Sequence, residues 1–370
     1  MKTSLLLNRL AAASVVATSL CATTAHSEDL QVKELATGLN HPWGMTFLPD
    51  NRLVITERGG AIQIYDAENG LSGDLEGVPK AATNNQGGML DILADPDFAS
   101  NQTLYFCYSK PGEGGSSSAV MKARLDGGKL VGGEDIFIAN PLVDNGFHFG
   151  CRLGFDAEKN LYITLGDRYK YMKEAQNTDN HHGKIVRIRP DGSIPDDNPF
   201  KDGQAPEVFS YGHRNVQGLT VHPESGEVWA MEHGPKGGDE VNKLAAGNNY
   251  GWPVITYGVD YSGEIISDKT RQEGMEQPVI YWDPSIAPSG MTFYYGDKFK
   301  AWEGDLLVGA LKFTHLRRIE MDGDTPGKQH EYLRERNQRI RDVEVGPDGL
   351  IYLLTDEANG KLLQLSPAQQ

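Results

Sequence analysis

Cysteine is scarce in this chain, with 3 residues in a sequence of 370. Cys21 lies in the N-terminal leader, where the preceding Leu20 is a poor fit for lipoprotein processing. That leaves Cys107 and Cys151, and two cysteines in a chain this long are not a disulfide framework. Because a sequence cannot supply the Cα separation that a bridge requires, we expect two buried thiols rather than one disulfide.

Basic residues are also few, with 35 Lys and Arg against 51 Asp and Glu and a formal net charge of −16. This balance argues against a nucleic-acid partner, because phosphate backbones bind basic surfaces. Any anion that the protein binds must therefore be held by a local cluster of basic side chains.

No apolar stretch is long enough to cross a membrane, so no membrane span is expected. The first residues instead have the layout of a secretory signal peptide, with Lys2 before a short apolar run at residues 10–20 and small residues up to Ser27. We expect residues 1–27 to be a signal peptide for export and residues 28–370 to form a single domain.

Convincing helical periodicity is missing, apart from a turn or two at residues 239–249. The 43 Gly and 19 Pro are typical of a turn-rich all-β chain. One pattern of apolar strand, tight turn and second apolar strand recurs, with copies that begin at Gly44, Met89, Gly150, Gly218, Gly290 and Asp342. The strands are apolar on alternate residues. Six copies predict an all-β, six-bladed β-propeller with four-stranded antiparallel blades.

The repeat also predicts where a site lies. Polar residues stand just before each inner strand, and because these strands run the same way, they gather at one mouth of the central channel. The second strand returns antiparallel, so its end reaches the same mouth. The residues placed there are Asn40, His41, Gln86, His148, Arg214, Asn215, Ala287 and Arg339, then Glu57, Asp167, residues 232–235, Lys312 and Asp356. A merely structural ring would not need this convergence.

Two of these residues form a candidate catalytic pair. His148 lies in NGFHFGCRLGF and Asp167 in YITLGDR, one strand–turn–strand later. A carboxylate beside a histidine fixes its tautomer and supports the imidazolium formed when it takes a proton. The alternative is a hydrogen-bonded structural histidine and a turn aspartate, and spacing alone does not decide between them.

The basic side chains at the mouth form a candidate anion-binding site. Arg341 stands two residues after Arg339, and on a regular strand their side chains would point to opposite sides, although a bend at the strand entrance can aim both inward. Arginine matches carboxylates with two parallel hydrogen bonds. The alternative is a set of surface cations on a loop rim.

The segment EHGPKGGDE at residues 232–240 combines acids with Gly and Pro that leave carbonyl groups exposed. Calcium prefers this mixture of carboxylate and carbonyl oxygens. The alternative is a polar glycine-rich loop, because the segment lacks EF-hand spacing.

At these motifs the chain resembles the soluble quinone-dependent sugar dehydrogenases, and most closely the aldose sugar dehydrogenases of Gram-negative periplasms. The likeness covers about residues 38–365 and is carried by GLNHPWGMTFLPD, NNQGGMLDI, HFGCRLGF, LGDR, YGHRNVQGL, EHGPKGGDE, NNYGWP and RIRDV. The resemblance implies a six-bladed propeller in the periplasm, with pyrroloquinoline quinone (PQQ) over the channel mouth and bound Ca²⁺.

Roles follow from this resemblance residue by residue. His148 matches the catalytic base, Asp167 its partner, and Arg214 a group that polarises the quinone carbonyl together with calcium. The positions that match cofactor contacts are Gln86, Arg214, Asn215, Tyr261, Lys312, Arg339 and Arg341. The carbonyls of Gly234 and Pro235 match ligands of the calcium that holds the quinone, and Glu240 with the Tyr250 backbone matches a second, structural calcium site.

The implied reaction is oxidation of the anomeric carbon of an aldose to a lactone by hydride transfer to PQQ. The chain has no Cys-x-x-Cys-His haem motif, so electrons would leave to a separate acceptor. The long loops of glucose-oxidising members are missing, which favours an open site with broad aldose specificity. The preferred sugar, the acceptor and the choice between monomer and homodimer stay open.

Two other functions compete. A Ca²⁺-dependent lactone hydrolase on a similar propeller would use metal-bound water and would not need Lys312, Arg339 and Arg341 for a tricarboxylate. A non-enzymatic glycan-binding propeller would not need His148 paired with Asp167.

Overall fold

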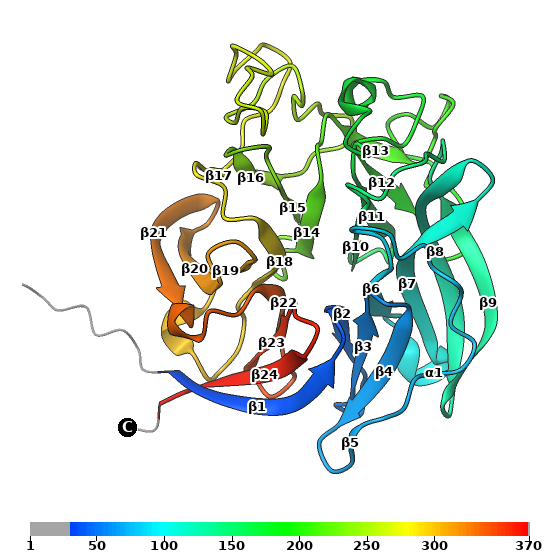
Figure 1. The fold of residues 1–370 in the computed structure, drawn as a ribbon, viewed down its shortest axis with the longest axis vertical. Helices are drawn as coiled ribbons and strands as arrows, with labels where there is room; N and C mark the ends of the chain where they lie inside the picture. The colour runs from blue at the N-terminus through cyan, green and yellow to red at the C-terminus, as the bar shows by residue number, and fades with distance from the viewer. Residues whose placement is uncertain (1–29, 369–370) are drawn as a thin grey trace, which may run out of the picture.

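The computed structural model describes residues 30–368, and the predicted signal peptide at residues 1–27 lies outside this part of the chain. The described chain folds into six sheets, each with four strands, arranged as blades around a central axis (Figure 1). The predicted six-bladed propeller is confirmed. Between residues 30 and 368 no helix is both long and apolar enough to span a bilayer.

The blades follow one another along the chain, each from its inner to its outer strand. Blade 1 contains β2 (Pro42–Phe47), β3 (Leu53–Glu57), β4 (Ala61–Asp66) and β5 (Gly70–Leu71), and blade 2 contains β6 (Met89–Ala94), β7 (Thr103–Gly112), β8 (Gly115–Asp126) and β9 (Lys129–Ile138). Blade 3 contains β10 (Gly150–Phe155), β11 (Leu161–Leu165), β12 (Lys184–Ile188) and β13 (Val208–Tyr211), and blade 4 contains β14 (Val216–Val221), β15 (Val228–Glu232), β16 (Asp239–Lys243) and β17 (Ile280–Trp282).

Blade 5 contains β18 (Pro288–Phe293), β19 (Leu306–Ala310), β20 (His315–Asp322) and β21 (Thr325–Tyr332). Blade 6 contains β22 (Ile340–Val345), β23 (Ile351–Thr355), β24 (Gly360–Pro367) and, as its outer strand, β1 (Leu30–Leu39). The helical segments are short: α1 (Phe98–Asn101) and the 3₁₀ turns η1 (Met172–Gln176), η2 (Lys300–Trp302) and η3 (Arg334–Arg336). The expected helical turn at residues 239–249 is wrong, because this segment begins with strand β16.

The ring closes through the first described strand. β1 pairs antiparallel with β24, from Leu30 opposite Pro367 to Leu39 opposite Gly360. The two ends of the described chain therefore share one blade, which Figure 1 shows where the blue and red strands meet. This pairing gives the last blade its fourth strand and hydrogen-bonds the ring shut.

Apolar side chains fill the spaces between adjacent blades. The second strands β3, β11 and β23 are buried along their whole length, as their runs of Leu, Val, Ile and Thr predict. The largest of these clusters joins blades 2 and 3 and includes Val120, Phe149, Leu153 and Leu161. Each such side chain contributes about 1.5–3 kcal/mol when fully buried, so the ring is a rigid frame for its mouth.

A disulfide crosses the same interface. Cys107 on β7 and Cys151 on β10 are bonded, with their Cα atoms 5.7 Å apart. The expectation of two free thiols is wrong, because blade packing brings together two strands whose spacing in the sequence says nothing about their distance. The bond ties blade 2 to blade 3 directly below the channel mouth.

Charged side chains bridge the inner strands within the channel. The Arg152 Nη1 donates to Asp91 Oδ1 at 3.1 Å and to Asp342 Oδ1 at 2.8 Å. The second oxygen of each aspartate accepts a backbone N–H from the next blade, Leu153 for Asp91 and Met45 for Asp342. Burial raises the pKa of Asp91 to about 6, although Arg152 opposes this shift. The network links blades 2, 3, 6 and 1 at the axis.

Every inner strand is irregular at its beginning. The register against the second strand shifts at Pro42/Met45, Met89/Ile92, Gly150/Leu153, Val216/Gly218, Pro288/Met291 and Ile340/Asp342. Such bulges bend a strand and re-aim its side chains. Because all six lie at the same end of the ring, the fold concentrates redirected side chains at one mouth.

Candidate active site

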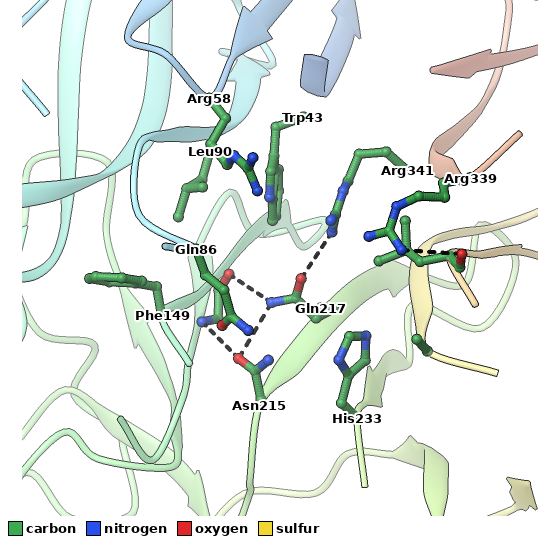
Figure 2. Close-up of a pocket in the computed structure, with 13 residues that line it drawn as sticks. Trp43, Arg58, Gln86, Leu90, Phe149, Asn215, Gln217, His233, Arg339 and Arg341 are labelled. Atoms are coloured by element: carbon green, nitrogen blue, oxygen red, sulfur yellow. Dashed lines mark hydrogen bonds between the residues drawn. The ribbon is translucent and has the colours of Figure 1, made fainter. Parts of the chain in front are cut away.

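A cavity of about 160 Å³, open to solvent, lies at this mouth (Figure 2). Its wall is formed by Trp43, Arg58, Gln86, Leu90, Phe149, Gly150, Asn215, Gln217, His233, Ala287, Leu311, Arg339 and Arg341. All six blades contribute to this wall, so the convergence predicted from the repeat is a property of the structure.

Two arginines of the wall share one carboxylate. Arg339 Nη2 and Arg341 Nη2 each lie 3.0 Å from Asp356 Oδ2, and His41 Nδ1 lies 2.9 Å from Asp356 Oδ1. The bulge at Ile340/Asp342 removes the alternation that would send the two arginines to opposite sides. Burial would raise the pKa of Asp356, but the charge of Arg341 and the hydrogen bond from His41 hold it well below its usual value.

The wall suits a flat, polyanionic molecule. Arg58, Arg339 and Arg341 supply three guanidinium groups, and the buried Nε of Arg341 has no hydrogen-bond partner among the described residues. Gln217 lies between Arg341 and Asn215 (Figure 2). Its Oε1 accepts from Arg341 Nη1 at 3.1 Å, and its Nε2 donates to Asn215 Oδ1 at 3.4 Å. Guanidinium groups bind carboxylates through paired charge-assisted hydrogen bonds. A cofactor with several carboxylates therefore fits this donor set.

His148 and Asp167 form a buried pair beside the cavity. His148 Nδ1 lies 2.7 Å from Asp167 Oδ1, and the two residues are 6% and 1% exposed. Asp167 also accepts hydrogen bonds from Trp252 Nε1 at 2.8 Å and from the Tyr169 backbone N–H at 2.8 Å. Burial and the nearby charge of Arg214 lower the pKa of His148, against the raising effect of Asp167. The carboxylate fixes the orientation of the histidine, whereas burial and the charge of Arg214 favour the neutral imidazole.

Two local features bring the pair together. The His148 backbone N–H donates to Gln86 Oε1 at 2.8 Å, so a residue of the cavity wall anchors the histidine. A Cβ on Gly166 would lie 2.1 Å from the His148 carbonyl oxygen, and therefore the motif LGDR needs glycine before its aspartate. Asp167 has a lowered pKa, because His148 and Arg214 outweigh the effect of its burial.

Arg214 connects this pair to the loop at residues 232–240. Its backbone carbonyl accepts from Asp167 N at 2.7 Å, and its Nη1 donates to the Gly234 carbonyl at 2.7 Å. The guanidinium carbon lies 5.4 Å from the Trp252 ring centroid and 6.0 Å from that of Tyr261. Arg214 thus carries a fixed positive charge between the histidine pair and the loop.

A second, smaller hollow of about 10 Å³ lies beside this loop, lined by Arg214, Glu232, His233, Gly234, Gly238, Glu240, Tyr250, Trp252, Ile255 and Thr256. Glu240 is paired in register with Glu232, and its Oε2 accepts from Asn242 Nδ2 at 3.2 Å. Burial, together with the charge of Glu232, raises the pKa of Glu240 to about 8. A divalent cation would relieve this repulsion, so the hollow fits calcium.

Asp239 holds the same loop in place. Its Oδ1 accepts from Gly234 N at 2.9 Å, and its Oδ2 accepts from Ile286 N at 2.7 Å and from Ala287 N at 3.0 Å. Within residues 30–368 no group of three or more His, Cys, Asp or Glu side chains is arranged to hold a metal ion. The predicted calcium ligands, the carbonyls of Gly234 and Pro235 and Glu240 with the Tyr250 backbone, stay predictions, and in this structure the Gly234 carbonyl accepts from Arg214.

Three predicted cofactor contacts, Arg214, Lys312 and Tyr261, lie outside the cavity wall, and Arg214 lines the smaller hollow instead. Lys312 is exposed, with its Nζ 5.2 Å from the Phe313 ring centroid, although the preceding Leu311 lines the cavity. Tyr261 is 59% exposed and lies near Arg214. The roles proposed for these three residues stay predictions.

Sequence reasoning missed several residues of the wall, including Trp43, Arg58, Phe149 and Gln217. Arg58 follows Glu57 at the end of a second strand, a position that the repeat already placed at the mouth. Trp43 and Gln217 lie within inner-strand bulges, so a strict period of two misplaces them. Phe149 stands directly beside the candidate base.

The fold and site together define a propeller with a basic cavity and a buried histidine–carboxylate pair at one mouth. The family model described as Glucose / Sorbosone dehydrogenase matches residues 39–364. The aldose sugar dehydrogenase YliI of Escherichia coli (strain K12) is 44% identical over 346 residues, which cover 91% of this chain and 93% of that protein. The chain therefore belongs to the glucose/sorbosone dehydrogenase family and is an oxidoreductase.

Solved structures agree with this assignment. The crystal structure of the soluble aldose sugar dehydrogenase from Escherichia coli in the apo form has a TM-score of 0.89 at 43% identity, covering 92% of this chain and 100% of that chain. The PQQ-bound aldose sugar dehydrogenase from Streptomyces coelicolor has a TM-score of 0.74 at 28% identity, with coverages of 92% and 99%. The resemblance drawn from the motifs is confirmed.

Proposed function

We propose that this protein is a periplasmic aldose sugar dehydrogenase that oxidises the anomeric carbon of its substrate to a lactone, with PQQ as cofactor and Ca²⁺ as its partner. Electrons would then pass to a separate acceptor. The observation that carries the proposal is the buried His148–Asp167 pair at the edge of a cavity lined by three arginines. The names of the Escherichia coli and Streptomyces coelicolor relatives support the same chemistry.

Residues of the wall would hold the cofactor. Arg339 and Arg341 would bind its carboxylates, Asn215 and Gln86 would bind its polar edges, and Arg58 adds a third guanidinium. The exposed Lys312 would reach the cavity only by a change of rotamer. When bound, the quinone would supply a carbonyl that accepts a hydride and calcium would supply Lewis acidity. Arg214 would hold positive charge near that centre.

His148 would act as the general base. Its Nδ1–H donates to Asp167, which leaves the lone pair on Nε2 to take the proton of the anomeric hydroxyl. Because burial and Arg214 lower its pKa, His148 is neutral at neutral pH and can accept that proton. Asp167 stabilises the imidazolium as it forms. His148 would hold the proton of the anomeric hydroxyl, the bound quinone would supply the hydride acceptor, and the product would be a lactone.

Two observations support a periplasmic location. The N-terminal sequence has the layout of a signal peptide. The Cys107–Cys151 disulfide is of a kind that persists in oxidising compartments and is rare in the cytosol.

The test is reconstitution of purified metal-free apo-protein with PQQ and Ca²⁺, followed by dye reduction with a panel of aldoses and detection of the lactone by NMR. We expect reduction that requires quinone, calcium and sugar together. The matched controls omit the quinone or add a chelator before it. Folded protein that binds the quinone yet reduces no dye with any aldose would contradict the proposal, and hydrolysis of added lactones would then point to the hydrolase alternative.

A further inference from the structure

Two exposed aromatic rings flank the candidate base and have no part in the proposed chemistry. Phe147 is 39% exposed and Tyr169 is 44% exposed. Their ring centroids lie 5.7 Å apart, and the Tyr169 ring lies 5.3 Å from that of His148 in an edge-on arrangement. The pair therefore forms a solvent-facing apolar surface, called the aromatic wall below, directly beside His148.

Side-chain hydrogen bonds fix the backbone at Phe147. Arg168 donates from Nε to the Phe147 carbonyl at 3.0 Å, from Nη1 to the Ser116 carbonyl at 2.8 Å and from Nη2 to the Asn145 carbonyl at 2.6 Å. The Phe147 N–H donates to Asn145 Oδ1 at 3.0 Å. Because the buried Arg168 guanidinium donates to three backbone carbonyls, it fixes the position of the loop that contains Asn145 and Phe147.

Tyr169 is held at some conformational cost. Its N–H donates to Asp167 Oδ1, the same oxygen that binds His148. Arg168 and Tyr169 have φ angles of 54° and 62°, and His148 has φ of 50°. Non-glycine residues in this left-handed region cost free energy and persist where the surroundings enforce them, typically at functional sites. One carboxylate thus positions both the base and the ring beside it.

We propose that Phe147 and Tyr169 form the sugar-binding wall of the site, stacking against the C–H face of an aldopyranose whose anomeric hydroxyl faces His148. This inference rests on the proposed function. A pyranose with equatorial hydroxyls presents axial C–H groups on its ring faces, and the negative face of an aromatic ring attracts them. The Tyr169 hydroxyl adds a polar group for a ring hydroxyl. The wall therefore selects ring-form aldoses with mostly equatorial hydroxyls.

The experiment compares Phe147→Leu and Tyr169→Leu with the wild type after loading with PQQ and Ca²⁺. We expect the KM for D-glucose to rise about tenfold in each variant, while kcat stays within about twofold and PQQ affinity is unchanged. The matched control is Phe47→Leu. Phe47 ends β2 at the opposite end of the ring, and its ring lies 4.9 Å from that of Tyr352. An unchanged KM in both wall variants would overturn the inference.

A second readout does not depend on turnover. Saturation-transfer NMR on quinone-free protein with D-glucose should show transfer from aromatic protons to the sugar C–H protons, and this transfer should weaken in Phe147→Leu and in Tyr169→Leu. Tyr169→Phe keeps the ring and removes only the hydroxyl, so its KM should rise less than that of Tyr169→Leu, and the wall stays testable if Tyr169→Leu does not fold. Wild-type protein without turnover would refute the proposed function, whereas turnover with unaffected wall variants would refute the wall alone.

Discussion

Replacing Asp167 with asparagine tests the base most sharply. The carboxylate accepts hydrogen bonds from His148 Nδ1, Trp252 Nε1 and Tyr169 N. An asparagine has one acceptor oxygen, so its NH₂ group would face one of these donors. If that donor is His148 Nδ1, the imidazole must move its proton to Nε2, the nitrogen that should accept the substrate proton.

The size of the effect follows from what is lost. General base catalysis contributes about 10²- to 10⁴-fold in rate, and a wrong tautomer removes it together with the stabilisation of the imidazolium. We expect kcat of Asp167→Asn to fall by about 10²- to 10⁴-fold, with PQQ affinity nearly unchanged because Asp167 does not line the cavity.

The assay is dye reduction over a range of aldose concentrations at each pH, which gives both kcat and kcat/KM. In the wild type the neutral form of His148 is active, and because its pKa is lowered from 6.5, the acid limb of kcat/KM should lie below pH 6.5. Removing the carboxylate lowers that pKa further, so the residual activity of Asp167→Asn should persist to lower pH. The control is Glu320→Gln in blade 5, where His330 Nε2 lies 2.7 Å from Glu320 Oε1 in a partly exposed pair. A kcat within threefold of the wild type in Asp167→Asn would refute the reasoning.

Three further predictions concern the frame and the metal. Cys107→Ser with Cys151→Ser opens a cross-link of 44 residues, and urea unfolding should show a loss of about 4 kcal/mol; an unchanged midpoint would contradict this. Arg152→Met removes the cation that pairs with two buried aspartates and should lower the free energy of unfolding by about 3–5 kcal/mol. Without Arg152 the pKa values of the two buried aspartates should rise further. A protein loses folding stability as pH rises through the raised folded-state pKa of a buried carboxyl, so the loss of stability in the variant should be larger at pH 8 than at pH 5. Equal losses at the two pH values would count against the network. Glu240→Gln should abolish most of the calcium-induced rise in Tm; a full rise would place the ion elsewhere.

The sequence predicted the parts of this structure that depend on local pattern. Alternating apolar residues and turns located all six inner strands, and their common direction placed Gln86, Asn215 and Arg339 at one mouth. The acidic residues Glu57, Asp167 and Asp356 follow from the same pattern, because each lies at or just after the end of a second strand.

What the pattern could not predict depends on bulges and on distant partners. Alternation puts Arg339 and Arg341 on opposite sides, and only the register shift beside Asp342 brings both to Asp356. The Arg152–Asp342 contact joins residues 190 positions apart, and the cysteine pair likewise depends on the docking of two blades. No local signal in a single sequence encodes these distances. The motif placed the backbone of Lys312 beside the cavity, but it could not predict that the side chain would be exposed and outside the cavity wall.

The most direct measurement of the central claim is a calorimetric titration of apo-protein with PQQ in the presence of Ca²⁺, for the wild type and for Arg341→Gln. We predict one quinone per chain and an affinity weakened by about 1.5–3 kcal/mol in the variant, as expected for a lost hydrogen bond to a charged group. Equal affinity of the two proteins would show that the quinone binds away from this cavity, and absence of binding to the folded wild type would contradict the assignment of the mouth as a cofactor site.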